Sequence, residues 1–471
     1  MMRTVFDAKR AVILTAAMAP SLSMAGGFSL NEQSASAMGT ANAGAAANPQ
    51  NASTVIFNPA GMTQLSGTNL SFGAAVLDID AEADKASATN QVGQPVQGST
   101  GGDIADPAYL PSAFLTHEMT ENVAVGVGLH APYGLAADYD DDFTGRYFAD
   151  ETELTGIALT PSIAVDSGDG LSLGVGVNVM YLDGKLSRFN DRSKKLAALR
   201  SQGPKGEAIA DAQLANPDPY SNVEGDTIEY TLRLGALYEL SNRTQFGITA
   251  ETGTGSELEG DITVSNFPAP TNQNPANTKT LKEDAEVPLD IPPSVTFGAR
   301  HQLNDEVTLL FGATWARWSD FEELDVYSAE AGTGEVSDVP ASKGNPITHI
   351  TEKWEDTWQY NLGATWQANP EWKLKAGYAW DESPVDNYST ARIPSQDRHW
   401  LTLGTQFAPA NSDWTVDAAV GTLIFDGDAK VDEQNYTHAT PQQSPNTDQS
   451  RYKGSYDLSA WSASVELSRS F

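Results

Sequence analysis

The sequence predicts an all-β fold, a closed 14-stranded antiparallel transmembrane β-barrel that is plugged by an N-terminal hatch containing short helices. Three observations lead to this fold class. Segments in which apolar and polar residues alternate recur along the chain, the connections between them alternate between short and long, and a segment rich in Ala and Gly precedes the first of them. A period of two is typical of a strand that has one apolar and one polar face.

The first 25 residues are predicted to be an export signal. Three basic residues precede the apolar stretch at 11–19, and Ser23-Met24-Ala25 is a small-x-small cleavage site. No later segment has the roughly 20 apolar residues that a transmembrane helix needs. We therefore expect three parts: a signal peptide (1–25), an N-terminal hatch (26–67) and the barrel (68–471).

The clearest strand signal is LSLGVGVNVMY at 171–181, where apolar residues occupy every odd position and Ser, Gly or Asn occupies most even ones. One face suits lipid and the other suits a polar lumen. Fourteen such segments are expected, an even number as in closed bacterial barrels. They lie near 68–79, 108–117, 122–131, 153–166, 171–188, 226–240, 244–260, 286–301, 307–320, 357–368, 372–381, 397–408, 414–426 and 458–471.

The connections between these segments indicate the topology. Six are short and rich in turn-forming residues: HEMTEN, DSGDG, ELSNRT, QLNDE, QANPE and APANSD. Short periplasmic turns and long outer loops are the pattern of outer-membrane barrels. The seven long connections lie near 80–107, 132–152, 189–225, 261–285, 321–356, 382–396 and 427–457.

The chain end and the tryptophans fit the same fold. The closing WSASVELSRSF resembles the C-terminal strand signature that outer-membrane proteins present to the barrel assembly machinery. We expect the strand-end tryptophans to form interfacial aromatic girdles in contact with outer-membrane lipid. The tryptophans concerned are Trp315, Trp318, Trp366, Trp372, Trp380, Trp400, Trp414 and Trp461.

A barrel of this size encloses a lumen that something must fill, because only smaller barrels fill themselves with side chains. Residues 26–67 are rich in Ala, Gly, Ser and Asn and carry few charges, which suits a compact plug. A flexible periplasmic tail is the alternative for this segment.

The composition excludes several classes of function. The chain has no cysteine, which excludes a disulfide scaffold and Cys-ligated metal sites, and its net charge of −34 disfavours nucleic acid as a partner. The acidity fits simple solubility, and it also fits loops that meet lipopolysaccharide through divalent cations. The six histidines are scattered outside any recognisable catalytic block, so we expect no enzyme activity, no metal and no cofactor.

The mature N-terminus GGFSLNEQSASAMGTANAGAAANPQNASTVIFNPAGM is similar to the start of the FadL/TodX (OmpP1) family of outer-membrane long-chain fatty-acid and hydrocarbon transporters. The blocks GRYFADETELTGIALTPSIAV, PPSVTFGARHQLNDEVTLLFGATWARWSDFEEL and WEDTWQYNLGATWQANPEWKLKAGYAWDESPVDNYSTARIPSQDRHWLTLG resemble family blocks in the same order. The resemblance implies a plugged 14-stranded barrel. It also implies capture of a hydrophobic molecule in a groove of the extracellular loops, transfer to an internal pocket and exit sideways through a gap in the wall.

The resemblance assigns roles to residues of the hatch. Asn58-Pro59-Ala60 falls on the family's NPA motif, where a Pro-fixed turn and an Asn side chain can hold the plug against the wall. Read without the family, these residues are only a turn. Phe28 matches a residue that lies against the bound tail and is therefore a candidate gate, with simple plug packing as the alternative.

The resemblance also assigns a head-group site. Arg188 matches an arginine that contacts the ligand head group in fatty-acid-carrying members, and its planar fork suits both oxygens of a carboxylate. The alternative is an exposed Arg that pairs with the acidic loops. A lysine that assists in those members is not matched, since Ile350 stands there and Lys353 is the nearest candidate.

The sequence Ala131-Pro132-Tyr133-Gly134 marks the expected lateral opening. Pro132 cannot donate a ladder hydrogen bond and Gly134 permits a bend, so the third strand either kinks here or ends here. The family places its lateral opening at a kink in this strand, which favours the kink. Uptake of aromatic or aliphatic hydrocarbons and a general diffusion porin are the alternative functions.

Overall fold

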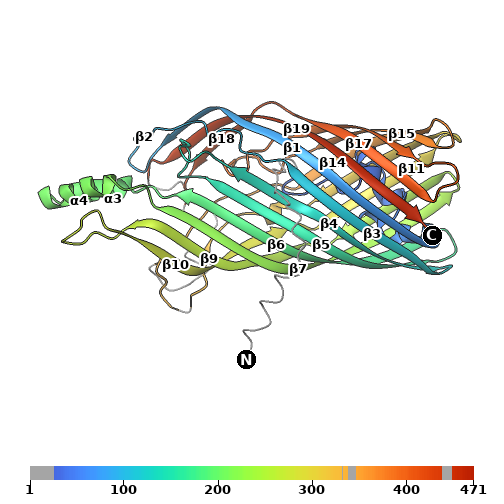
Figure 1. The fold of residues 1–471 in the computed structure, drawn as a ribbon, viewed down its shortest axis with the longest axis horizontal. Coiled ribbons are helices and arrows are strands. Elements are labelled where there is room, and N and C mark those ends of the chain that lie inside the picture. The colour runs from blue at the N-terminus through green and yellow to red at the C-terminus, as the bar shows by residue number, and fades with distance from the viewer. Residues whose placement is uncertain (1–25, 331, 338–345, 437–447) are drawn as a thin grey trace.

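The computed structural model describes residues 26–330, 332–337, 346–436 and 448–471 (Figure 1). Within these residues fourteen wall strands form a closed antiparallel β-barrel, as predicted, and the predicted signal peptide lies outside them. The barrel closes where β1 pairs with β19 along its whole length. The wall strands are β1 (Thr68–Thr89), β3 (Ala108–Thr120), β4 (Val123–Asp138), β5 (Glu151–Asp166), β6 (Leu171–Phe189), β7 (Tyr220–Ser241), β8 (Thr244–Glu251) continued by β9 (Thr254–Pro268), β10 (Thr278–Ile291) continued by β11 (Ser294–Gln302), β12 (Val307–Ala316), β14 (Thr357–Gln367), β15 (Trp372–Asp381), β16 (Arg398–Phe407), β17 (Trp414–Phe425) and β19 (Arg451–Ser470).

Two predicted strands are interrupted in the structure. The segment expected at 286–301 is split into β10 and β11 at Pro292-Pro293, where the missing amide hydrogens break the ladder. The segment expected at 244–260 is split into β8 and β9 at 252–253. Each half keeps its own partner, because β9 pairs with β10 and β8 pairs with β11.

Short and long connections lie at opposite ends of the barrel (Figure 1). All six predicted short turns join consecutive wall strands, and they lie at the end that also holds the C-terminus. The other end carries the long loops, with the short strands β2 (Pro95–Val96), β13 (Tyr327–Ser328) and β18 (Ala429–Gln434). It also carries α3 (Ser193–Arg200) and α4 (Pro204–Leu214), which the sequence analysis assigned only to a long loop.

The outer face of the wall is apolar. On β6, Leu171, Leu173 and Val175 are exposed, as the alternation at 171–181 predicts. Among the predicted girdle tryptophans, Trp366, Trp372 and Trp461 are exposed, whereas Trp318 and Trp400 are buried, so the prediction is wrong for these two. No described helix combines the length and the apolar character needed to cross a bilayer.

Residues 26–67 lie inside the barrel at the short-turn end (Figure 1). Their helices are short: α1 (Ala35–Met38), η2 (Ala45–Ala47), α2 (Thr54–Phe57) and η3 (Pro59–Gln64). They approach the wall closely because glycines face them, and a Cβ on Gly247 would lie 1.9 Å from the carbonyl oxygen of Ala46. The wall glycines whose nearest Cβ neighbours lie in this segment include Gly126, Gly128, Gly174, Gly235, Gly298, Gly363, Gly377 and Gly404.

Buried polar contacts fix the hatch to the wall. The ammonium of Lys375 donates to the carbonyl oxygen of Ser36 at 2.9 Å and to Oδ1 of Asp417 at 2.7 Å. The carboxylate of Glu466 accepts a hydrogen bond from Ser34 Oγ. Because a buried charge is tolerated only when it is paired and hydrogen-bonded, these groups hold the hatch in one position.

Asn58 of the NPA motif joins the hatch to the wall as well. Its Nδ2 donates to the carbonyl oxygens of Ala46 in the hatch, at 2.7 Å, and of Ala236 on β7, at 3.0 Å. Its Oδ1 accepts from the amide of Ala60 at 3.0 Å, and Pro59 occupies the first turn of η3. The side chain therefore caps a helix and contacts the barrel at the same time.

Candidate functional site

Strand β4 leaves its neighbour β3 halfway along the barrel. The β3–β4 ladder stops at the pair Ala113 and Leu129, although β4 continues to Asp138. On the other side, the register with β5 slips between His130 and Tyr133. The strand is therefore kinked at Pro132, and the alternative that Pro132 ends the strand is wrong.

The hatch takes the place of the missing strand neighbour. The amide of Leu30 donates to the carbonyl oxygen of Pro132 at 2.9 Å, and the amide of Gly134 donates to the carbonyl oxygen of Phe28 at 3.0 Å. Ser29 forms an antiparallel bridge with Tyr133. The inward bend at 132–134 is thus satisfied by backbone groups of residues 28–30.

A second proline lies at the same level, and the sequence analysis missed it. If the antiparallel β3–β4 register continued two residues beyond the pair Ala113 and Leu129, Ala131 would lie opposite Pro111. Pro111 has no amide hydrogen to donate to a neighbouring strand. The proline at 111 in the sequence YLPSAF is the signal that could have located this end of the β3–β4 ladder.

Phe28 is enclosed by aromatic rings. Its ring centroid lies 4.6 Å from Trp318, 5.8 Å from Tyr133 and 6.0 Å from Phe321. The preceding Gly27 has a φ of +67°, and a Cβ there would lie 2.3 Å from the Trp318 ring. Phe28 is therefore held between the kink of β4 and the aromatic residues of the loop after β12.

An apolar cavity, here called the inner cavity, lies beside Phe28. Phe321 and Leu324 from the loop after β12 form part of its wall, and Gly184 and Gly225 leave space on β6 and β7. Its remaining lining residues are Leu135, Thr152, Glu153, Leu154, Lys185, Leu186, Val223, Leu258, Val287, Leu289 and Ile393.

A polar cavity, here called the outer cavity, contains Arg188. Arg188 follows Leu186 of the inner cavity by two residues on β6, so the two cavities are adjacent along this strand. Arg188 donates a long hydrogen bond of 3.5 Å to Oγ1 of Thr348. The other lining residues are His349, Ile350, Thr351, Asn387, Tyr388, Ser389, Thr390, Asp432, Glu433, Gln434, Asn435 and Tyr436.

A second arginine lies at the boundary between the cavities. Arg392 is 2% exposed, and its Nη1 donates to Oγ1 of Thr152, which lines the inner cavity, at 2.9 Å. Its Nη2 donates to the carbonyl oxygen of Ser187 at 2.9 Å, whereas its buried Nε has no hydrogen-bond partner among the described residues. Burial, reinforced by repulsion from Arg188, lowers the pKa of Arg392 to about 10.

Two carboxyl groups accompany the arginines. Glu352 lies in the loop after β12 and is buried, and Glu433 lies in β18, within the outer loops. Burial raises the pKa of Glu352 to about 8, with repulsion by Glu433 acting in the same direction. Burial also raises the pKa of Glu433 to about 7, against the attraction of Arg392 and Arg188. Glu352 is therefore mostly protonated at neutral pH, whereas Glu433 is protonated in about half of the molecules.

Lys353, the nearest candidate for the assisting lysine of the family, lies apart from Arg188. Ile350 is buried and lines the outer cavity together with Arg188. Lys353 does not line either cavity, and its ammonium lies 5.7 Å from the ring centroid of Tyr388, which does line the outer one. The second cation near Arg188 is thus Arg392, which the sequence analysis did not single out although it stands in the quoted STARIPSQDR.

Known outer-membrane proteins are similar to this chain over nearly its whole length. Residues 16–471 match the family model described as outer membrane protein transport protein (OMPP1/FadL/TodX). A putative outer membrane protein of Neisseria meningitidis serogroup B is 30% identical over 410 residues, covering 85% of this chain and 86% of the relative. The long-chain fatty acid transport protein of Escherichia coli K12 is 25% identical over 449 residues, covering 92% and 95%.

The solved structures support the fold. The crystal structure of a Pseudomonas aeruginosa FadL homologue superimposes with a TM-score of 0.76 at 23% identity, covering 96% of this chain and 99% of that one. At this identity the similarity establishes the barrel architecture, and the chemistry must be argued from the residues that line the cavities.

Proposed function

This chain belongs to the outer membrane protein transport family (OMPP1/FadL/TodX), and from that premise we propose that it takes up long-chain fatty acids. It is an outer-membrane transporter of fatty acids or other hydrophobic compounds. The narrower assignment to a carboxylic acid rests on the chemistry of the two cavities. The Escherichia coli relative that carries the name long-chain fatty acid transport protein supports it.

One observation carries the proposal: the apolar inner cavity ends at two arginines. Arg392 bonds to Thr152 of the inner cavity, and Arg188 follows Leu186 of the same cavity on β6. A tail in the inner cavity would place its head group at this boundary. Guanidinium groups in a site that excludes water bind carboxylates strongly, because the charge-assisted hydrogen bonds are not screened.

The proposed route runs from the outer loops to the inner cavity and then sideways between β3 and β4. The ladder between these strands stops at Leu129, and Phe28 lies between the kink and the inner cavity. Movement of Phe28 would join the cavity to the unpaired part of β4. A sideways exit releases the tail into the bilayer without exposing it to water.

The test compares two ligands of equal chain length, oleate and an uncharged hydrocarbon, on the purified protein. Replacing Arg188 by Ala should weaken oleate binding at least tenfold, because hydrogen bonds to charged groups contribute about 1.5–3 kcal/mol. Binding of the hydrocarbon should not change. Arg200→Ala on α3, which removes an exposed partner of Asp211, is the matched control. Equal losses for both ligands would remove Arg188 from the head-group role.

An uncharged hydrocarbon is the second candidate substrate, and one observation favours it. Ile350 places an apolar side chain beside Arg188, where fatty-acid-carrying members are expected to have a lysine. Mass spectrometry of lipids that co-purify with the protein distinguishes the two classes directly. A general porin is disfavoured because the hatch fills the lumen, and exclusion of small sugars in liposome swelling would confirm that it is closed.

A further inference from the structure

Two segments of the long loop after β12 form a small antiparallel ladder outside the wall. Glu323 pairs with Thr351 and Val326 pairs with Thr348, so that Asp325 stands opposite His349. The amides of Leu324 and Val326 each donate to a carbonyl oxygen of the facing segment at 2.9 Å. This loop ladder, residues 323–326 with 348–351, presents alternate side chains to opposite faces.

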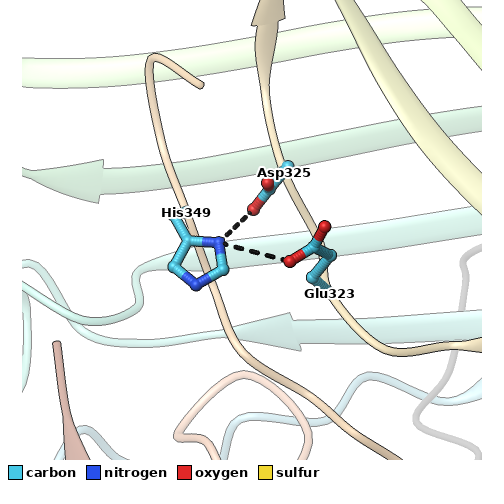
Figure 2. Close-up of side chains that lie close together, drawn as sticks. All are labelled: Glu323, Asp325 and His349. Carbon is cyan, nitrogen blue, oxygen red and sulfur yellow. Dashed lines mark hydrogen bonds and ion pairs between the residues drawn. The ribbon is translucent and has the colours of Figure 1, made fainter. Parts of the chain in front are cut away.

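One face of the loop ladder gathers three metal-binding side chains. Figure 2 shows Glu323 and Asp325 from one segment directed at the imidazole of His349 from the other. Nδ1 of His349 lies 2.6 Å from Oδ1 of Asp325 and 3.8 Å from Oε2 of Glu323. The Asp325 side chain is 2% exposed and the Glu323 side chain is 36% exposed, so water reaches part of the Glu323 side chain.

The spacing of these atoms suits a tetrahedral ion. Ligand atoms bound 2.0–2.1 Å from Zn²⁺ at tetrahedral angles lie about 3.3 Å from one another. The two His349 distances bracket that value, and all three ligand atoms lie within 4.8 Å of one another. Bringing all pairs of ligand atoms to this separation takes side-chain shifts of up to about 1.5 Å.

The ligands already have outer partners that would orient them. The hydroxyl of Tyr327 donates to Oδ2 of Asp325 at 2.9 Å, which leaves Oδ1 facing the imidazole. Nε2 of His349 lies 3.1 Å from Oγ1 of Thr351. This oxygen can accept a hydrogen bond from Nε2–H once Nδ1 binds a cation. Such outer hydrogen bonds fix the tautomer and the ring orientation of a metal-binding histidine.

We propose that Glu323, Asp325 and His349 bind one Zn²⁺ ion, with water as the fourth ligand on the exposed side. One imidazole and two carboxylates suit Zn²⁺, whereas Ca²⁺ and Mg²⁺ prefer sites built from oxygen alone. Because the ligands come from both segments, the ion holds the loop ladder closed.

The loop ladder reaches the substrate cavities with both faces, because His349 and Thr351 of the metal-binding face also line the outer cavity. Leu324 lines the inner cavity, Ile350 lines the outer one, and Thr348 accepts the hydrogen bond from Arg188. Zinc binding would therefore stiffen the wall on the side that faces the substrate. The zinc site is tested separately from the proposed function, because zinc is titrated in the absence of any fatty acid even though His349 also lines the outer cavity.

The test uses full-length protein in detergent, stripped with EDTA and then titrated with Zn²⁺ alone. Wild type should bind one ion per chain, and His349→Ala should weaken this binding at least tenfold. Zinc should also slow hydrogen exchange of the Leu324 and Val326 amides. In the matched control His399→Ala, binding should be unchanged, because His399 lies 3.0 Å from a single carboxylate, that of Asp426.

A variant that fails to fold would not decide the matter, so Glu323→Gln is measured in parallel. The side chain of Glu323 is partly exposed, and this change should preserve the barrel while weakening zinc binding about tenfold. Wild-type affinity in both variants would overturn the proposal. Zinc binding that is equally weak in wild type and His349→Ala, with no effect on amide exchange, would overturn it as well.

Discussion

Binding of a long-chain anion should weaken as the pH rises from about 6 to about 9, because two carboxyl groups beside the arginines lose their protons over that range. Burial sets the pKa of Glu352 at about 8 and that of Glu433 at about 7. At the lower pH both are neutral and the guanidiniums of Arg188 and Arg392 give this group of four a charge of about +2. At the higher pH the two carboxylates cancel that charge.

The size of the effect follows from Coulomb's law. At an effective dielectric constant of about 20, one charge about 8 Å from the ligand head group changes its binding free energy by about 2 kcal/mol, or roughly thirtyfold. Salt screens part of this interaction near the outer loops. We therefore expect a loss of about tenfold for each carboxylate and of about a hundredfold for both.

The assay needs a ligand whose own charge does not change. A long-chain alkyl sulfonate stays anionic throughout, and the primary alcohol of equal length stays neutral. Sulfonate binding to the purified protein should fall with pH, and alcohol binding should not. Combining Glu352→Gln with Glu433→Gln should flatten the sulfonate curve at its low-pH level, whereas Glu355→Gln, at an exposed carboxylate, should leave the wild-type curve unchanged.

Two outcomes would refute this reasoning. Sulfonate affinity that is independent of pH would mean that the two carboxyl groups do not act on the ligand. An unaltered slope in the double variant would assign the pH dependence to other groups.

Two further predictions concern the wall and the hatch. Pro132→Ala restores an amide hydrogen at the kink and should slow uptake of labelled oleate by cells while leaving binding to the purified protein intact; unchanged uptake would count against the sideways exit. Lys375→Met leaves the Asp417 carboxylate buried without its cation, so thermal unfolding should show that the free energy of unfolding falls by about 3–5 kcal/mol. The double variant Lys375→Met with Asp417→Leu should recover much of this loss. An unaltered unfolding midpoint in Lys375→Met would mean that the pair does not anchor the hatch.

For several strands, the sequence predicted the membrane part better than the outer part. The first strand was expected at 68–79, where apolar and polar residues alternate, but β1 continues to Thr89. Residues 80–89 are polar or small on both faces, because this part of the strand lies beyond the lipid. Periodicity fades where no bilayer selects for it, so the outer strand ends could not be recognised.

One part of the candidate site could likewise be predicted from the sequence, and another part could not. Pro132 marked the position of the disturbance because a proline removes a ladder hydrogen bond by itself, and the family resemblance favoured a kink over a strand end. Arg392, Glu352 and Glu433 lie about 40 residues apart in the chain and meet only because separate loops fold over the barrel mouth. No spacing rule connects them, and each looks like an ordinary loop charge in a very acidic sequence.

The contacts of the hatch favour a sideways exit over passage through the lumen. In an apolar wall an unpaired backbone group costs several kcal/mol, and residues 28–30 satisfy two such groups of β4. A movement of Phe28 that includes its backbone would break the hydrogen bond that its carbonyl oxygen accepts from Gly134, so it would also loosen the wall beside the kink. Passage through the lumen would instead require removal of the whole hatch, with the buried contacts of Lys375 and Glu466. A tail that moves only Phe28 would disrupt far fewer interactions, which supports the proposed exit into the bilayer.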